Sequence, residues 1–289
     1  MHTLLISVPE LRQLQDSGQP LVIFDCSAEL MNPQAADTLY EQLHIAGARQ
    51  AHLDRDLSAK APGDAINGGR HPLPRRETVA AWLGSQGVDN RTQVVAYDRN
   101  GCNYCGRLWW MLKWLGHDAV AVLDGGLQAW QAAGGPTASG RPAAAARACT
   151  FTPGTPLRAL LDLPTVAARL GQPGQTVVDA RAAARYRGEV EPLDPIAGHI
   201  PGALNRPFAD NFGPDGRFKS PDQLRREWTA ILGGRAPAGV VHQCGSGVSA
   251  VPNLMAMELA GLGPTGLYAG SWSEWSRTPG MPCEQGPAR

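Results

Sequence analysis

The residues best suited to chemistry lie in one short segment, Cys-Gly-Ser-Gly-Val-Ser-Ala, which begins at Cys244. An apolar run, 239–243, precedes the cysteine and a longer one, 251–259, follows the segment. This pattern predicts a buried strand, a tight glycine-rich turn and a helix. At such a junction the unpaired loop amides and the helix dipole favour negative charge. A cysteine placed there tends to be a thiolate, which is the nucleophilic form. We therefore predict that Cys244 is a catalytic nucleophile.

The loop after Cys244 has the composition of a cradle for an anion. Gly245 and Gly247 permit the close approach and the unusual φ angles with which successive N–H groups point at one centre. Ser246 and Ser249 add hydroxyl donors. Such a cradle would stabilise a thiolate, a persulfide or a phosphoryl group on the cysteine.

Two hydrolytic reactions are open to a nucleophilic cysteine, that of a cysteine-dependent phosphatase and that of a Cys–His hydrolase. A cysteine-dependent phosphatase needs an arginine at the end of the loop to grip phosphate oxygens, but Ala250 stands there and 244–259 contains no arginine. Phosphate transfer is therefore disfavoured. A Cys–His hydrolase needs a histidine base, and His242 could share a face with Cys244 because alternate strand residues point the same way. A packed or hydrogen-bonded histidine is the commoner case, so we expect His242 to be structural.

The two halves of the sequence resemble each other in the same order. Matching segments are 21–25 with 175–179, 43–48 with 198–203, 93–98 with 239–244, and 123–130 with 268–275. Short apolar strands alternate with amphipathic helices in each half. Helices are expected over 78–87 and 222–232, the second with Ser220 as N-cap and Pro221 at the first position. The alternation predicts an α/β fold with two tandem domains, each a mostly parallel sheet flanked by helices.

The repeat also predicts the domain organisation. We expect an N-terminal domain over 1–136, a linker rich in glycine, proline and alanine over 137–156, and a C-terminal domain over 157–289. Asp98 matches Cys244 in the alignment of the halves, so only the C-terminal domain offers a nucleophile. The N-terminal domain is therefore predicted to be non-catalytic.

Composition excludes several classes of partner. The formal net charge is zero and no long charged block occurs, so no nucleic-acid partner is expected. No run approaches the ~20 apolar residues of a membrane helix, and no membrane partner is expected. The first residues lack the basic and apolar regions of a signal peptide, which favours a cytoplasmic protein.

The other cysteines do not suggest a metal site or a disulfide framework. Six cysteines in 289 residues are too sparse for disulfide scaffolding. Cys102 and Cys105 form a lone CxxC without a second pair of ligands, so we expect two neighbouring thiols, with a redox role as the alternative. No dinucleotide fingerprint is present, and we predict neither metal nor cofactor.

Several motifs together are similar to those of one family. They are His44-Ile45-Ala46-Gly47-Ala48, Arg185-Tyr186-Arg187-Gly188, Gly198-His199-Ile200-Pro201-Gly202-Ala203, the element 123–130, and Gly270-Ser271-Trp272-Ser273-Glu274-Trp275. With them the chain resembles the tandem-domain rhodanese-like sulfurtransferases over nearly its whole length. The Cys244 loop looks like the CGSGVT loop of 3-mercaptopyruvate sulfurtransferases, whereas thiosulfate-specific rhodaneses typically carry CRKGVT.

The resemblance implies a sulfur-transfer reaction. The Cys244 thiolate would take sulfur from 3-mercaptopyruvate to form a persulfide, pyruvate would leave, and a thiol acceptor such as thioredoxin, or cyanide, would remove the outer sulfur. Two alternatives stay open: a thiosulfate:cyanide sulfurtransferase, and a non-catalytic sulfur-carrier or binding module.

The resemblance also implies roles for individual residues. Ser246 would act in catalysis, by a hydrogen bond to the sulfur or by helping to protonate the leaving enolate. Arg185 would bind the donor carboxylate, for which its planar fork is suited. Asp56 and His71 would be contributed by the first domain, which predicts a site at the domain interface. The remaining substrate-binding positions are those of the loop, namely Gly245, Gly247, Val248 and Ser249.

The chain departs from the family pattern in two places. Mercaptopyruvate enzymes usually carry a second arginine in a Glu-Pro-Arg context, where this chain has Leu193 and Asp194. Arg187 is the expected substitute. Ala269 replaces an aspartate that is common before Gly-Ser-Trp. The missing arginine is the reason why thiosulfate stays open as the donor.

Overall fold

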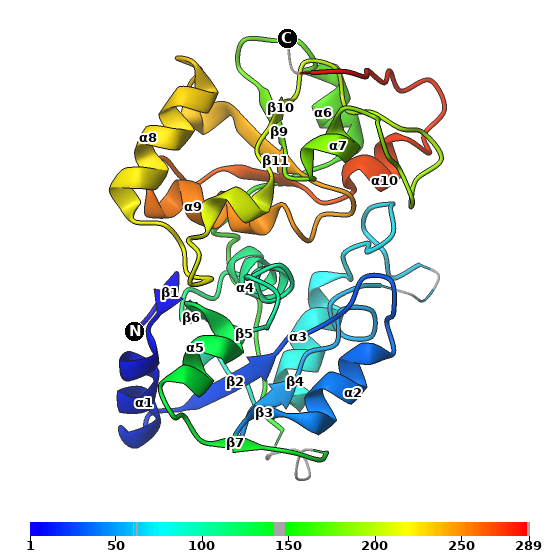
Figure 1. The fold of residues 1–289 in the computed structure, drawn as a ribbon. Helices are drawn as coiled ribbons and strands as arrows, with labels where there is room; N and C mark the ends of the chain where they lie inside the picture. Colours follow the sequence, from blue (N-terminus) through cyan, green and yellow to red (C-terminus); the bar gives the residue numbers. More distant parts are fainter. Residues whose placement is uncertain (60, 62, 142–147, 288–289) are drawn as a thin grey trace. The chain divides into compact units, whose positions relative to one another are not determined.

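The computed structural model describes residues 1–59, 61, 63–141 and 148–287, which form two compact units (Figure 1). The first unit comprises Met1–Ala65, Pro74–Leu157 and Pro214–Arg217. The second comprises Ile66–Leu73, Arg158–Gly213 and Phe218–Arg289. Each unit is a parallel sheet flanked by helices, which confirms the predicted fold class.

The first unit has a five-stranded sheet in the order β1-β6-β5-β2-β4, and all paired neighbours run parallel. Its strands are β1 (Leu5–Ile6), β2 (Leu21–Asp25), β4 (Arg49–Gln50), β5 (Gln93–Tyr97) and β6 (Val120–Leu123). A small antiparallel pair joins β3 (His44–Ile45) to β7 (Thr137–Ala138). The helices are α1 (Val8–Asp16), α2 (Ala35–Gln42), α3 (Arg76–Ser85), α4 (Cys105–Trp114) and α5 (Gly126–Ala132).

The second unit has the corresponding sheet, in the order β10-β9-β11-β12-β8, again parallel throughout. Its strands are β8 (Leu160–Leu161), β9 (Thr176–Asp179), β10 (Leu204–Asn205), β11 (Val240–Gln243) and β12 (Gly266–Tyr268). The helices are α6 (Leu163–Ala168), α7 (Ala183–Tyr186), α8 (Pro221–Leu232), α9 (Val251–Leu259) and α10 (Ser271–Trp275), with 3-10 turns η1 (Phe208–Asn211) and η2 (Pro237–Gly239).

The central strand β11 is buried on both faces, which explains its apolar sequence. Val241 packs in a cluster with Trp272 and Trp275 on one face of the sheet. Val240 packs with Trp228 and the helices of the other face. Trp228, Trp272 and Trp275 are fully buried, and the strand that they support ends directly before Cys244.

Both predicted helices form, α3 two residues earlier at each end than predicted and α8 one residue longer at its start. α8 begins at Pro221, and the Ser220 hydroxyl accepts the Gln223 N–H at 3.4 Å, as the N-cap pattern predicted. α3 starts at Arg76 and not at Thr78, because the Thr78 hydroxyl donates to Asp64 at 2.7 Å and does not cap the helix.

One short segment of the N-terminal half, residues 66–73, packs within the second unit. The predicted boundary at 136 did not anticipate this exchange, because the segment carries no repeat motif of its own. The predicted linker, 137–156, lies partly outside the described residues, at 142–147. The linker and the exact domain limits therefore stay predictions.

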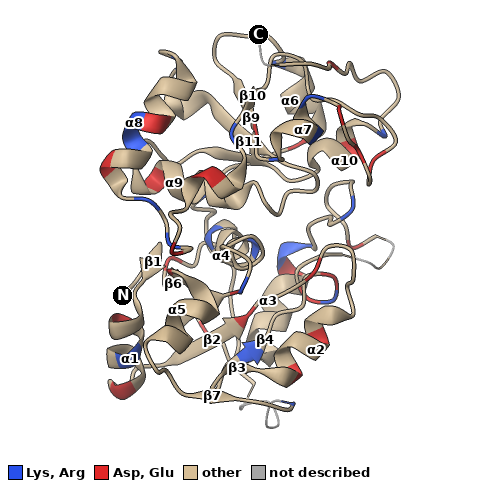
Figure 2. Ribbon diagram, viewed as in Figure 1, with Lys and Arg blue, Asp and Glu red and all other residues tan. Residues whose placement is uncertain are grey.

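Charges of both signs are interspersed on the elements of each unit, for example along α8 (Figure 2). Among the described residues, none of the helices has the length and apolar character needed to cross a membrane.

Candidate functional site

Cys244 follows β11 directly, and its backbone is held on both sides by α10. The Cys244 N–H donates to the Ser271 hydroxyl at 3.1 Å, and the Cys244 carbonyl accepts the Trp272 N–H at 3.0 Å. Ser271 has a left-handed backbone, with φ of +54°, and its hydroxyl also donates to the Tyr268 carbonyl at 2.9 Å. The buried cysteine is therefore fixed at the carboxyl end of the sheet, where parallel sheets bind ligands.

The loop after Cys244 folds back on the sulfur. The Ser246 N–H donates to the Cys244 Sγ at 3.4 Å. Gly247 has φ of +74°, and a Cβ there would lie 2.2 Å from the Ala269 carbonyl oxygen, so no other residue fits. Val248 is buried and Ser249 is half-buried. The Ser246 N–H is thus in place to support negative charge on the sulfur. The predicted role of the other loop residues in binding an anion stays a prediction.

His71 is brought next to this loop. Its Nδ1 lies 2.7 Å from the Ser246 hydroxyl, and both side chains are buried. The 66–73 segment that carries His71 is held by α10, because the Gly68 N–H donates to Glu274 at 2.6 Å and the Arg70 N–H to Ser273 at 3.0 Å. A histidine and a serine hydroxyl in contact form a group that can pass a proton.

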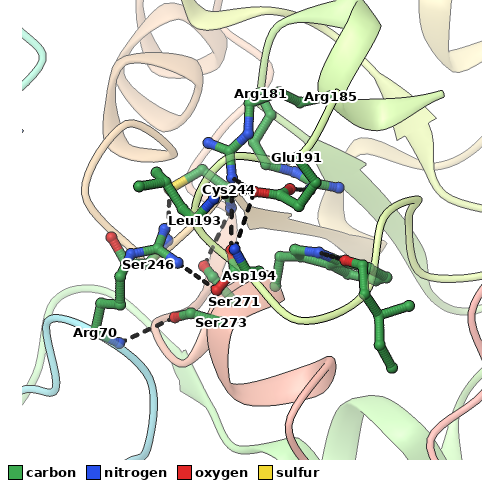
Figure 3. A network of polar contacts seen from close by, with 12 residues as sticks. Arg70, Arg181, Arg185, Glu191, Leu193, Asp194, Cys244, Ser246, Ser271 and Ser273 are labelled. Atoms are coloured by element: carbon green, nitrogen blue, oxygen red, sulfur yellow. Dashed lines mark hydrogen bonds and ion pairs between the residues drawn. The ribbon is translucent and has the colours of Figure 1, made fainter. Parts of the chain in front are cut away.

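Two arginines, Arg70 and Arg185, approach Gly245, the residue after Cys244. Figure 3 draws both arginines together with Cys244 and Ser246. A Cβ on Gly245 would lie 2.8 Å from Arg70 Nη2 and 3.5 Å from Arg185 Nη1. Gly245 has no left-handed φ, and a side chain there would displace the ends of these two arginine side chains. Arg185 lies near the loop, and its role as the carboxylate-binding residue stays a prediction. Arg70, which precedes His71, was missed by the sequence reasoning.

Behind these arginines lies a buried ionic cluster that the sequence reasoning also missed. Arg181 donates through Nη2 to Asp179 at 2.6 Å and to the Gly198 carbonyl at 2.6 Å, and it pairs with Glu191 at 3.3 Å. Burial opposes the charge of Arg181, but Asp179, Glu191 and Cys244 more than offset this and raise its pKa. The available signal was the Asp-Ala-Arg sequence at the end of β9, the strand that neighbours β11.

His242 lies in the core and not at the sulfur. Its ring stands edge-on to Trp228 with the centroids 5.6 Å apart, and neither ring nitrogen has a hydrogen-bond partner. Burial lowers the pKa of His242 to about 3. A neutral, packed histidine agrees with the structural role expected for it.

The buried His242 predicts an acid-sensitive stability. The pKa of His242 is lower in the folded protein than its ordinary value of 6.5. The contribution of the neutral ring to folding stability is therefore complete above about pH 6.5, and it is lost as the pH falls from 6.5 toward about 3. When the pH falls from about 7 to about 5, the unfolding free energy of the wild type should decrease by about 2 kcal/mol more than that of His242→Gln. Urea unfolding at both pH values measures this, and an equal loss in the two proteins would contradict the prediction.

Two predicted site residues are not joined to this arrangement by any contact described here. Asp56 lies in the first unit, where its carboxylate accepts the His52 N–H at 2.8 Å. Burial raises the pKa of Asp56, although this hydrogen bond lowers it. Arg187 pairs with Glu189 at 2.7 Å, and both side chains are substantially exposed. The roles of Asp56 and Arg187 at Cys244 stay predictions.

The equivalent loop of the first unit already holds an anion of its own. The Asp98 carboxylate accepts four backbone N–H groups, from Asn100, Cys102, Tyr104 and Cys105, at 2.8–3.1 Å. The Asp98 carbonyl accepts the Leu127 N–H at 3.0 Å, the counterpart of the bond between Cys244 and Trp272. The same turn therefore binds a carboxylate in one unit and presents a sulfur in the other.

The CxxC thiols lie in this first-unit loop. Burial and a hydrogen bond with Cys102 raise the pKa of the Cys105 thiol well above its ordinary value. A buried, protonated thiol is a poor nucleophile, which favours the interpretation as two neighbouring thiols. Within the described ranges, no three or more His, Cys, Asp or Glu side chains are grouped to hold a metal ion.

Comparisons with known proteins agree with this geometry. The rhodanese-like domain family matches residues 7–133 and 162–278. A Pseudomonas aeruginosa protein named "Probable 3-mercaptopyruvate sulfurtransferase" is 46% identical over 271 residues, which cover 93% of this chain and 94% of that protein. The Mus musculus "Thiosulfate sulfurtransferase" is 32% identical over 270 residues, covering 90% and 86%.

Solved structures give the same assignment. The 3-mercaptopyruvate sulfurtransferase from Leishmania major superposes with a TM-score of 0.80 at 30% identity, over 95% of this chain and 74% of that one. Both units carry the family's sheet, and the position directly after the central strand is Asp98 in the first unit and Cys244 in the second. The chain therefore belongs to the rhodanese-like family, with two copies of the domain in tandem.

Proposed function

We propose that this protein is a sulfurtransferase that moves sulfur from 3-mercaptopyruvate, through a persulfide on Cys244, to a thiol acceptor. The observation that carries the proposal is the convergence on one loop of a buried cysteine, the His71–Ser246 pair and the guanidinium groups of Arg70 and Arg185. These groups match the needs of an α-keto acid donor, namely a nucleophile, a proton donor near the keto group and cations for the carboxylate.

In the first step the Cys244 thiolate attacks the sulfur of the donor. A new S–S bond forms, the bond between sulfur and C3 breaks, and its electron pair passes to pyruvate enolate. A proton then converts the enolate to pyruvate, and Ser246, hydrogen-bonded to His71, is the group placed to supply it. The N–H groups of Gly245, Ser246, Gly247, Val248 and Ser249 support the persulfide anion left on the enzyme.

The second step returns the enzyme to its thiol form. A thiolate such as that of reduced thioredoxin attacks the outer persulfide sulfur, forming its own persulfide and releasing the Cys244 thiolate. Cyanide does the same and leaves as thiocyanate. Thioredoxin as the physiological acceptor is implied by the family resemblance, and a cytoplasmic location is suggested by the N-terminal sequence. Both belong to this proposal.

The choice of donor is tested by steady-state kinetics. We expect kcat/KM with 3-mercaptopyruvate to be at least about tenfold higher than with thiosulfate, cyanide being the acceptor in both assays. The reason is that Arg70 and Arg185 form a two-armed carboxylate site, whereas Gly245 and Ser246 supply no cation to the loop itself. Faster turnover with thiosulfate would contradict the proposal and support the thiosulfate alternative, which the absence of arginine at Leu193 and Asp194 favours.

A further inference from the structure

Asp194 is a buried carboxylate that the sulfur-transfer steps do not use. Its side chain has no exposed surface, and three guanidinium groups contact it. Arg70 Nη1 contacts Oδ1, Arg185 Nη2 lies 3.5 Å from Oδ2, and Arg277 Nη1 lies 3.6 Å from Oδ1. A buried carboxylate costs free energy unless it is paired, so its place among arginines demands an explanation beyond packing.

The carboxylate spans the two arginines that approach the nucleophile's loop (Figure 3). Each arginine gives one terminal nitrogen to a different oxygen of Asp194 and turns its other terminal nitrogen toward Gly245. The distances from a Gly245 Cβ are 2.8 Å to Arg70 Nη2 and 3.5 Å to Arg185 Nη1. The Asp194 carboxylate thus directs the guanidinium groups of Arg70 and Arg185 toward the same residue, Gly245.

The backbone around Asp194 is itself fixed. Glu191 Oε1 accepts the Leu193 N–H at 3.0 Å and the Asp194 N–H at 3.2 Å, and the same oxygen accepts Arg185 Nη2 at 2.6 Å. On the other side, the Arg70 backbone is tied to Ser273. Asp194 therefore connects a rigid turn after α7 to the 66–73 segment.

We propose that Asp194 is a positioning residue, which pairs Arg70 with Arg185 into a single receptor for the carboxylate of the sulfur donor. The inference rests on the proposed function and deepens it. Two guanidinium groups side by side repel each other, and the intervening carboxylate removes that repulsion while leaving both forks directed at Gly245. Asp194 then stabilises the donor-binding geometry, although its own charge has the same sign as the donor's.

Because of that sign, replacing Asp194 separates two accounts. If the residue only contributed its negative field, Asp194→Asn would bind the anionic donor more tightly and lower KM. If it positions the arginines, KM for 3-mercaptopyruvate rises at least about tenfold while kcat stays within about threefold, since the sulfur chemistry is intact. Steady-state rates with 3-mercaptopyruvate and cyanide give both values.

A double-mutant cycle shows whether Asp194 acts through Arg70. The effect of Asp194→Asn on KM should be clearly smaller in an Arg70→Gln background, because only Arg185 is then left for Asp194 to position. Fully additive effects would overturn the inference.

The matched control is Asp210→Asn, which removes the same charge from an exposed carboxylate of the second unit. It should leave KM and kcat unchanged. Thermal unfolding shows whether Asp194→Asn folds, and Asp194→Glu, which keeps the charge but displaces its oxygens, is the second variant. An unchanged or lowered KM in either folded variant would overturn the inference. A wild type without activity toward 3-mercaptopyruvate would overturn the proposed function itself.

Discussion

Cys244→Ser is expected to lower the rate of sulfur transfer at least about 10³-fold, because a serine hydroxyl is not ionised near neutral pH and cannot form a persulfide. The substitution changes one atom at a site where backbone bonds to Ser271 and Trp272 fix the position of the residue. The fold should therefore persist. The rate of pyruvate release from 3-mercaptopyruvate measures the loss.

Mass spectrometry of the donor-treated protein identifies the residue that carries the sulfur. The wild type should gain the mass of one sulfur atom, and Cys244→Ser should gain none. Cys283→Ser is the matched control, since it removes an exposed thiol that donates to the Met281 carbonyl at 3.7 Å. This variant should retain both the adduct and the rate. An adduct that persists in Cys244→Ser would show that another thiol is the nucleophile.

The strand, loop and helix around Cys244 could be predicted from sequence because their determinants are local. The apolar run before Cys244, the glycines after it and the next helix follow one another along the chain, and each has a direct physical consequence. The repeat was equally informative. His44 stacks on Tyr40 at 4.0 Å and His199 on Tyr186 at 3.8 Å, so matched segments adopt matched contacts.

The electrostatic environment of the site could not be predicted in the same way. Arg70, Asp194 and Arg277 come from distant parts of the sequence, and no spacing pattern relates them. The substitution of an arginine by Leu193 and Asp194 suggested a weakened anion site. The structure gives Asp194 three arginine partners, one of them from the 66–73 segment. The positive charge that is missing at Leu193 and Asp194 is supplied by Arg70, which the tertiary fold brings next to Asp194.

The first-unit loop explains what the anion cradle requires. Asp98 and Cys244 occupy equivalent places, and each has its carbonyl bonded to the helix that follows the next strand. Gly126 and Ser271, also equivalent, share a left-handed backbone with φ of +57° and +54°. In the first unit a carboxylate satisfies the turn permanently. In the second, the small sulfur leaves the turn able to receive a charge that forms during the reaction.

Asp98→Ala should therefore destabilise the first unit by about 3–5 kcal/mol, because four backbone N–H groups lose their acceptor in a buried turn and each unsatisfied donor costs about 1–3 kcal/mol without full additivity. Asp98→Asn should have a smaller effect, since the amide keeps one acceptor oxygen but turns its NH₂ toward two N–H donors. Urea unfolding followed by tryptophan fluorescence measures the free energy.

The same variants distinguish a structural from a catalytic Asp98. Asp16→Ala, at an exposed position of α1, is the control and should change the unfolding free energy by less than about 0.5 kcal/mol. Under conditions in which Asp98→Ala stays folded, its kcat should remain within about threefold of the wild type, because Cys244 keeps its own loop and hydrogen bonds. A stable Asp98→Ala protein with a large loss of kcat would contradict this account, and would mean that the first unit's carboxylate takes part in sulfur transfer and does not simply fill its turn.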